Sequence, residues 1–500
     1  MGAKLIKITN FISHRTALSL LIFTIFCRLP FFFRDIYDWD ESTFLLVGQS
    51  LLDGHLPFTK LWDLKPALLG YIYGFIIFFS GKSIFLIRLY GSLFVFGTSM
   101  AVYFLGKTIA NKSVGIFASL LFISYASLFP GGQGFLSEHA AIPFLMYGSL
   151  LYIRNQNSPF FSGLLLSLAA MIRLNLAFVG AGLLIGILFS FLRSRDLNRL
   201  VYVLKYCLGG FVGLFLIALP YLLIGKVDLW FRSTFLAPFS YSNYQMSVIK
   251  VFLKQLENIW WATFPKGDLS LVILGVFIWM GTFGYLLNKK SAKEKKVLYI
   301  FVLVFFSIIK SGAAFSHYLI QLFPFLCIFS ILFFAKIFEK FRFETRNLIL
   351  LPVFAASFSL GNQYFRNIWE TLDPPRWTFG FSTRLVDSLE NYYHTDDQFF
   401  FMCDHLTYWW FEKEPMRPSI THPSNITRDY LFEFMEKAEK SSFEEFQVLL
   451  KKKPTWIIKK PNEKYLSKIP GGQEYLQNVL RREYSLFRKM EGREIWHLNK

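Results

Sequence analysis

The stretch "RLPFFFRDIYDWDESTFLLVGQSLLDGHLPF", residues 28–58, marks a change of character in the chain. An apolar segment precedes it, and four acids then stand within seven positions: Asp35, Asp38, Asp40 and Glu41. The chain carries no acid before this point. The carboxylates therefore lie at the mouth of a candidate membrane helix, where ionisable groups are costly and usually functional.

The composition around this stretch is that of a membrane protein. The chain has 500 residues, of which 54% are hydrophobic and 17% charged, and its mean hydropathy is +0.39. Soluble domains carry about 25% charged residues. Long apolar runs recur over the first 360 residues, and they do not alternate as barrel strands do. We therefore predict an all-α polytopic membrane protein.

The formal charge of +19 is explained by topology, because Lys and Arg collect in cytoplasmic loops. The basic residues sit between hydrophobic spans, which argues against a nucleic-acid partner. The four cysteines, Cys27, Cys207, Cys327 and Cys403, show no C-x-x-C spacing and predict neither a disulfide framework nor a cysteine metal site. The basic N-terminus and its apolar run lack a small-residue cleavage site, which predicts an uncleaved signal anchor.

The apolar runs predict about eleven membrane-spanning helices, since a span needs about 20 apolar residues and sometimes 17. The predicted spans are 16–33, 84–106, 113–130, 138–153, 160–173, 175–192, 201–224, 269–288, 297–313, 317–336 and 347–360.

The charge of the loops decides between two short segments, 66–80 and 160–173. Basic loops at 106–113, 154–157, 193–199, 288–296 and 336–346 all belong in the cytoplasm with the N-terminus. All of these loops face the cytoplasm if 160–173 spans the membrane and 66–80 is a juxtamembrane or re-entrant helix on the outer side. The N-terminus is then cytoplasmic and the C-terminus lies outside.

Two domains are predicted. Residues 1–360 form the transmembrane part, with a first outer loop at 34–83, and residues 361–500 form a small soluble α/β domain on the outer side. Within this tail, 398–404 and 455–460 are expected to be buried strands. The segment 428–453 contains amphipathic helical spacing.

Polar residues gather at the predicted outer ends of the spans. The first loop carries Asp38, Asp40, Glu41, Asp63 and Lys65, and Asp35 and Asp53 are expected to be solvated acids. Later outer turns carry Glu138, His139, Arg173, His317 and Tyr318. Each has an ordinary alternative: Glu138 could cap its helix, Arg173 could snorkel to the interface, and His317 could be a satisfied interfacial histidine.

Together these residue types suit a reaction at the outer face. A carboxylate can take a proton from an attacking hydroxyl or amine. Cations can hold a phosphate, and Arg does so with bidentate geometry. A base with phosphate-binding cations beside lipid suits group transfer from a lipid-linked phosphate, but the spacing does not identify the group transferred.

The stretch 28–75 resembles the first outer loop of the GT-C glycosyltransferases, and it is most similar to the bacterial protein O-mannosyltransferase and aminoarabinose transferase group. The matching features are Asp40-Glu41, a small-residue helix ending at Gly54 and Pro57, and Lys65-Pro66 opening another helix. Glu138, Arg173 and "HYLIQLFP" (317–324) extend the resemblance, which covers residues 15–335 and is loose in the tail.

The resemblance implies an inverting transfer from a polyprenyl-phosphate sugar at the periplasmic face of the bacterial inner membrane. Asp40 would be the catalytic base and Glu41 would position the acceptor or the base. Lys65 and Arg173 would contact the donor phosphate.

The remaining residues would shape the site: Asp38, Glu138, His317 and Tyr318. No cofactor is implied as a requirement, although Glu138, His139 and His317 could hold a divalent metal ion. Two departures from the family pattern stand out, namely Glu138 where many relatives have Asp and Ala67 where the aminoarabinose enzymes carry a second Pro.

The sequence therefore predicts a glycosyltransferase whose acceptor is a lipid-linked glycan, lipopolysaccharide or protein. A transporter or lipid flippase is the alternative, and it would be expected to show paired interrupted helices in two halves. No such symmetry is found in the sequence. A non-catalytic scaffold is a third option, against which the outer polar cluster argues.

Overall fold

The computed structural model describes residues 14–154, 158–244, 246–265, 268–340 and 378–499, with 357, 358, 360 and 361 between them. The chain divides into two compact units. The first combines residues 1–32, 88–215 and 245–370, and the second combines 33–87, 216–244 and 371–500. Each unit is thus built from segments that lie far apart in the sequence.

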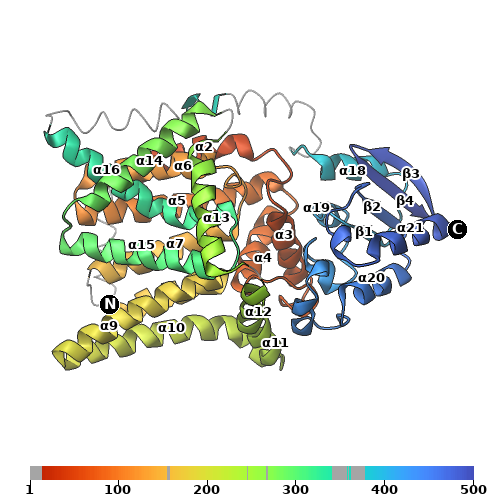
Figure 1. Cartoon of the computed structure of the whole chain (residues 1–500), viewed down its shortest axis with the longest axis horizontal. Helices are drawn as coiled ribbons and strands as arrows, with labels where there is room; N and C mark the ends of the chain where they lie inside the picture. The colour runs from red at the N-terminus through yellow and green to blue at the C-terminus, as the bar shows by residue number, and fades with distance from the viewer. Residues whose placement is uncertain are drawn as a thin grey trace. The chain divides into compact units, whose positions relative to one another are not determined.

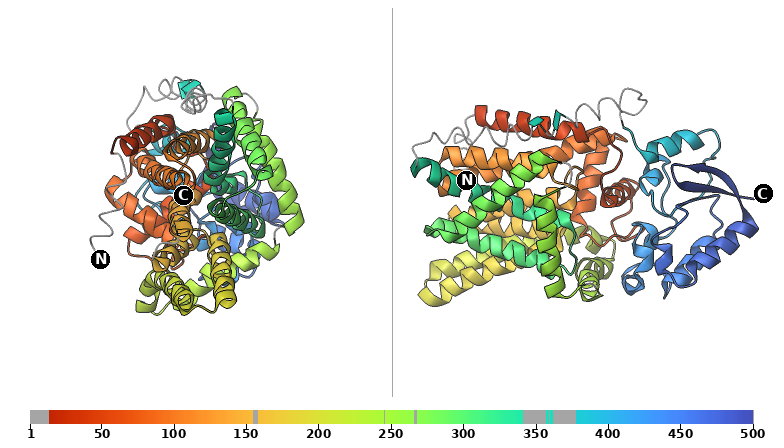
Figure 2. Two further views of the ribbon diagram at one scale, coloured as in Figure 1. Left: turned by 90° about the vertical axis from the view of Figure 1, so that its left-hand side faces the viewer. Right: turned by 45° about the horizontal axis from the view of Figure 1, so that its top comes forward.

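The first unit is a bundle of apolar helices, most of which run in a common direction (Figures 1 and 2). Each predicted span before residue 340 coincides with a helix, and 347–360 lies largely outside the described residues. Helices α5 and α10 continue into the second unit. The elements are α2 (His14–Arg28), η1 (Leu29–Phe31), α5 (Ile84–Ile109), α6 (Lys112–Leu128), α7 (Ser137–Arg154), α8 (Pro159–Ile172), η2 (Leu174–Leu176), α9 (Ala177–Ser194), α10 (Leu197–Leu223), α13 (Val248–Thr263), α14 (Leu269–Leu287), α15 (Ala292–Lys310), η4 (Ser316–Leu322) and α16 (Phe323–Lys340).

Several of these helices fit a bilayer. Among the described residues, five helical segments are long and apolar enough to cross a membrane: Ile84–Ile109, Leu174–Ser194, Leu197–Leu223, Leu269–Leu287 and Ser316–Glu339. Large apolar side chains point outward from them, and Leu192 and Phe211 are 67% and 63% exposed. An apolar surface of this kind marks a membrane or protein contact.

Arg28, the first residue of the quoted stretch, organises the turn before α7 in this unit. Its guanidinium is buried and donates to the carbonyl oxygens of Gly132, Gln133 and Gly134 at 3.1, 2.8 and 2.9 Å. Backbone carbonyls that a turn leaves unpaired must find donors when they are buried. Arg28 supplies them, and the turn that it holds leads directly into α7.

The second unit contains the first loop, the segment before residue 245 and the tail. Its elements are α3 (Trp39–Leu52), α4 (Leu68–Ser80), α11 (Val227–Phe231), the π-helix η3 (Arg232–Leu236), α12 (Ala237–Tyr244), α18 (Phe381–Leu389), β1 (Phe399–Phe401), α19 (Leu406–Trp410), η6 (Pro418–Ile420), η7 (Asn425–Thr427), η8 (Asp429–Phe434), α20 (Ser442–Lys451), β2 (Trp456–Lys459), η9 (Leu466–Lys468), α21 (Gly472–Glu483), β3 (Tyr484–Met490) and β4 (Arg493–Leu498).

Helices α3 and α4 approach each other closely because glycines line their contact. A Cβ added at Gly48 would lie 2.7 Å from the Cβ of Tyr73, and one at Gly74 would lie 2.8 Å from Leu51. Gly54 ends the turn after α3 with a φ of +90°, which glycine adopts most readily. The small-residue helix expected from the family resemblance is α3, and its small residue Gly48 lies where α3 packs against α4.

The tail is built on a four-stranded mixed sheet of order β1-β2-β4-β3. Strands β1 and β2 are parallel, whereas β4 is antiparallel to both β2 and β3. The predicted strands in 398–404 and 455–460 are confirmed as β1 and β2. Figure 1 shows α20 and α21 beside this sheet, and their side chains Phe446 and Leu476 share its buried core with Ile457.

Hydrogen bonds join the tail to the first loop within the second unit. The hydroxyl of Thr421 accepts from the backbone N–H of Trp62 at 3.2 Å, and the indole of Trp62 donates to Ser233 at 3.0 Å. Asp35 is only 4% exposed and accepts from the N–H of Ser382 at 3.0 Å. The prediction of a solvated Asp35 is thus wrong, because its partner comes from the distant tail.

The glycine contact yields a stability prediction. Gly48→Ala should lower the free energy of unfolding by about 1–3 kcal/mol, because the new methyl group would overpack α3 against α4. Gly210→Ala in α10 is the control, since no heavy atom lies within 4 Å of its added Cβ. Thermal unfolding in detergent checks both, and equal midpoints for the two variants would contradict the packing.

Candidate active site

Helix α3 presents Asp40 at its N-terminal end. Asp38 is the N-cap residue, and its carboxylate accepts from the backbone N–H of Asp40 at 2.9 Å. A carboxylate in the first turn of a helix is stabilised by the unpaired N–H groups and the helix dipole. Asp38 therefore starts the helix and sets the position of Asp40.

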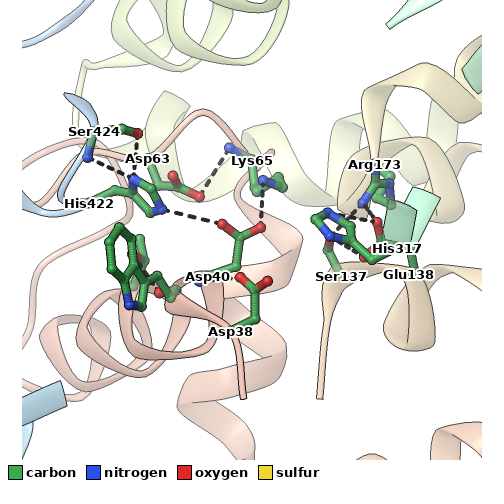
Figure 3. A network of polar contacts seen from close by, with 12 residues as sticks. Asp38, Asp40, Asp63, Lys65, Ser137, Glu138, Arg173, His317, His422 and Ser424 are labelled. Atoms are coloured by element: carbon green, nitrogen blue, oxygen red, sulfur yellow. Dashed lines mark hydrogen bonds and ion pairs between the residues drawn. The ribbon is translucent and has the colours of Figure 1, made fainter. Parts of the chain in front are cut away.

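The carboxylate of Asp40 lies between two basic side chains of the second unit (Figure 3). Lys65 Nζ is 3.2 Å from Oδ2, and His422 Nε2 is 3.4 Å from Oδ1. The side chain of Asp40 is 20% exposed, so a substrate can reach it. A half-buried carboxylate held in this way has the geometry of a general base.

Lys65 lies at the boundary between this polar group and an apolar pocket. Its backbone N–H donates to Asp63 at 3.3 Å, and its Nζ is 5.6 Å from the centre of the Phe44 ring. Phe58 and Ala67 line the same small pocket with Lys65. A cation beside apolar surface suits the phosphate of an amphiphilic ligand.

Two aromatic rings lie close to the acidic group. The rings of Trp39 and Tyr465 are 5.6 Å apart, and Lys460 Nζ is 5.9 Å from the centre of the Trp39 ring. Burial raises the pKa of Tyr465 to about 12; Arg428 lowers it, and nearby acids raise it. The Tyr465 phenol is therefore neutral and able to donate a hydrogen bond at any ordinary pH.

Glu41 follows Asp40 in the first turn of α3. It is buried, and its carboxylate accepts from the backbone N–H of Tyr37 at 3.0 Å. This contact closes the turn that precedes α3. The role predicted for Glu41, positioning the acceptor or the base, stays a prediction.

The first unit holds a second polar cluster, built on a buried ion pair. Arg173 Nη1 donates to the carboxylate of Glu138, and it also donates to Ser137 at 2.9 Å (Figure 3). Arg173 and Glu138 are 4% and 1% exposed. The ring of Tyr318 covers the guanidinium at 4.3 Å, and His317 Nε2 lies 3.7 Å from the carboxylate of Glu138.

The residues expected to be able to hold a metal do not fit one in this arrangement. The guanidinium of Arg173 takes the Glu138 oxygen that a cation would need. His139 Nδ1 accepts from the N–H of Leu136 at 3.1 Å, so a neutral ring carries its proton on Nε2. Over the described ranges, no group of three or more His, Cys, Asp or Glu side chains is placed to bind a metal ion.

The structure thus brings the predicted residues together in two groups. Asp38, Asp40 and Lys65 meet in the second unit, while Glu138, Arg173, His317 and Tyr318 meet in the first.

The group in the second unit gains residues that sequence reasoning missed, namely Trp39, His422 and Tyr465. His422 and Tyr465 come from the tail, where the family resemblance is loose. The sequence signal that could have pointed to His422 is the stretch "THPSN" (421–425), in which the histidine stands beside small polar residues and a proline.

Comparison with solved structures identifies proteins of similar fold. No protein-family model and no curated protein sequence matches the chain. Its structure is similar to that of ArnT from Cupriavidus metallidurans bound to undecaprenyl phosphate, with 10% identity and a TM-score of 0.60 over 96% of this chain and 97% of that one.

The archaeal oligosaccharyltransferase of Archaeoglobus fulgidus is also similar. In complex with zinc and sulfate it matches with 12% identity and a TM-score of 0.51, over 97% of this chain and 73% of that one. The same enzyme, AglB, in complex with an inhibitory peptide and a dolichol phosphate, matches with 11% identity and a TM-score of 0.50, over 98% and 75%. The chain thus has the fold of these GT-C glycosyltransferases, and the resemblance seen in the first loop is confirmed at the level of the fold.

The buried ion pair yields a second stability prediction. Arg173→Met should destabilise the protein by about 3–5 kcal/mol, because it leaves the charge of Glu138 buried without its partner. The double variant Glu138→Gln/Arg173→Met should recover most of that loss. Arg384→Met, which removes an exposed ion pair with Glu491, is the control and should change little.

Thermal unfolding measures all three variants. A double variant no more stable than Arg173→Met would contradict the account, because its instability would then come from packing and not from an unpaired charge.

Proposed function

We propose that this chain, which has the GT-C fold, is an integral-membrane glycosyltransferase. It transfers a sugar from a polyprenyl-phosphate carrier to an acceptor at the periplasmic face of the bacterial inner membrane. The observation that carries the proposal is the half-buried carboxylate of Asp40, held 3.2 Å from Lys65 at the start of α3.

The similar structures support the donor. ArnT binds undecaprenyl phosphate and AglB binds a dolichol phosphate, both of which are phosphates on long isoprenoid chains. In this chain Lys65 offers a cation beside a pocket lined by Phe44, Phe58 and Leu69. This combination of charge and apolar surface suits a phosphate attached to a lipid.

Asp40 would act as the base of a single displacement. It takes the proton of the acceptor hydroxyl while the acceptor oxygen forms a bond to the anomeric carbon of the sugar. The bond from that carbon to the phosphate oxygen breaks, and polyprenyl phosphate leaves with the bonding electrons. Attack opposite the leaving group inverts the anomeric carbon.

Lys65 would stabilise the charge that develops on the departing phosphate. Lys65 contacts Asp40 at 3.2 Å, and donor binding would draw it from the carboxylate toward the phosphate. Arg173 is the second cation proposed to contact the donor phosphate. It would have to exchange part of its contact with Glu138 for the phosphate.

The acceptor is proposed to be a glycan or lipid-linked glycan, with lipopolysaccharide or protein as further members of the class. The rings of Trp39 and Tyr465 beside Asp40 support a carbohydrate, because aromatic rings offer apolar faces and the Tyr hydroxyl a hydrogen bond.

We also propose the topology of eleven spans, with a cytoplasmic N-terminus and a periplasmic C-terminal domain at 361–500. The units support the choice between the two short helices. Helix α8 belongs to the first unit with the other spans, whereas α4 belongs to the second unit with the first loop and the tail. The two helices have nearly the same length, 13 residues in α4 and 14 in α8, so length does not decide between them.

The function is tested on purified protein in liposomes with a panel of polyprenyl-phosphate sugars and a glycolipid acceptor. The unmodified protein should consume one donor, and Asp40→Asn should lower the rate at least about 1,000-fold without lowering the unfolding midpoint. Asp53→Asn, an exposed acid of the same loop, is the control and should keep full activity. Full activity of Asp40→Asn would remove Asp40 from the reaction.

A further inference from the structure

His422 brings the tail into contact with the proposed base. Its Nε2 lies 3.4 Å from Asp40 Oδ1, on the carboxylate oxygen that Lys65 does not contact. The two side chains therefore hold different oxygens of one carboxylate (Figure 3). A carboxylate has about four lone-pair positions, two on each oxygen.

The other ring nitrogen of His422 fixes where its proton lies. The backbone N–H of Ser424 is 3.2 Å from Nδ1, and a backbone N–H can only donate. Nδ1 therefore accepts, and Ser424 Oγ at 2.8 Å can donate to it as well. A neutral His422 then carries its proton on Nε2, the nitrogen that faces Asp40.

The backbone around His422 is anchored to the first loop. Thr421 accepts from the N–H of Trp62 at 3.2 Å, and its carbonyl oxygen accepts from Thr43 in α3 at 3.4 Å. Thr421 also donates to the carbonyl of Pro418 at 2.9 Å, within its own turn. The position of His422 is thus tied to the same helix that presents Asp40.

A second histidine, His405, lies near His422 but is engaged elsewhere. Burial lowers the pKa of the neighbouring His405 to about 4, so that ring is neutral at ordinary pH. His405 also contacts the carbonyl oxygen of Ile420 through its Nε2 at 2.9 Å. Lys65, Asp38 and the neutral Tyr465 are further charged or titratable groups close to Asp40.

We propose that His422 is a positioning residue for Asp40: its Nε2–H aims the carboxylate at the acceptor, and Ser424 holds the ring in the required tautomer. The proposal rests on the proposed function for its kinetic meaning. It makes the tail a part of the active site, because His422 of the tail contacts Asp40 of the first loop.

The kinetic test compares three variants of the full chain. His422→Phe keeps a ring without the donor and should lower kcat about 10- to 100-fold with little change in the donor KM. The acid limb of its pH–rate profile should move to higher pH, because the ionised carboxylate loses the polar Nε2–H group 3.4 Å away. His422→Gln restores a donor and should recover most of the rate, while His394→Phe, an exposed tail histidine, should behave as unmodified protein.

An unchanged kcat and pH profile in His422→Phe, beside an inactive Asp40→Asn, would overturn the proposal and leave the proposed function standing. Loss of rate without rescue by His422→Gln and without a shifted acid limb would assign His422 a purely structural role.

A measurement without turnover tests the contact itself. The protein has eight histidines, and ¹⁵N-histidine labelling with solid-state NMR in liposomes can identify His422 by the signal that His422→Gln lacks. Its Nε2 should carry the proton, and Asp40→Asn should shift that resonance. An unshifted resonance would contradict the contact even if no donor in the panel is consumed.

Discussion

The contact of Asp40 with Lys65 and His422 is the constraint on which the second unit depends. One acid at the start of α3 meets a lysine of the same loop and a histidine of the tail, 3.2 and 3.4 Å away. A half-buried carboxylate is stable there because the ammonium group of Lys65, the ring nitrogen of His422 and the start of a helix compensate for the lost water. The first loop and the tail are thereby parts of one compact unit, although they lie at opposite ends of the sequence.

The same requirement for partners organises the first unit. Glu138 and Arg173 are almost fully buried, and each would be costly without the other. Arg28 is equally buried and satisfies three carbonyl oxygens of the turn before α7. Buried charges therefore fix turns of this bundle, where apolar packing alone would leave backbone groups without partners.

The helices could be predicted from the sequence because membrane spans are long and continuously apolar. The site residues of the first loop could also be predicted, because Asp40 and Lys65 belong to a motif of neighbouring residues. His422 could not be found in this way, because its meaning comes from a contact with a residue far away in the chain. Asp35 shows the same limit: an acid that seemed solvated is buried against Ser382 of the tail. Local patterns predict local elements, and contacts between distant segments remain hidden until the chain is folded.

The central claim is that Asp40 and Lys65 form the place where a polyprenyl phosphate meets its acceptor. An experimental structure of the protein with a bound polyprenyl phosphate tests this most directly. The account predicts a phosphate oxygen within hydrogen-bond distance of Lys65 Nζ, with the carboxylate of Asp40 still held by His422. A phosphate bound away from Lys65, with the contact between Lys65 and Asp40 unchanged, would contradict it.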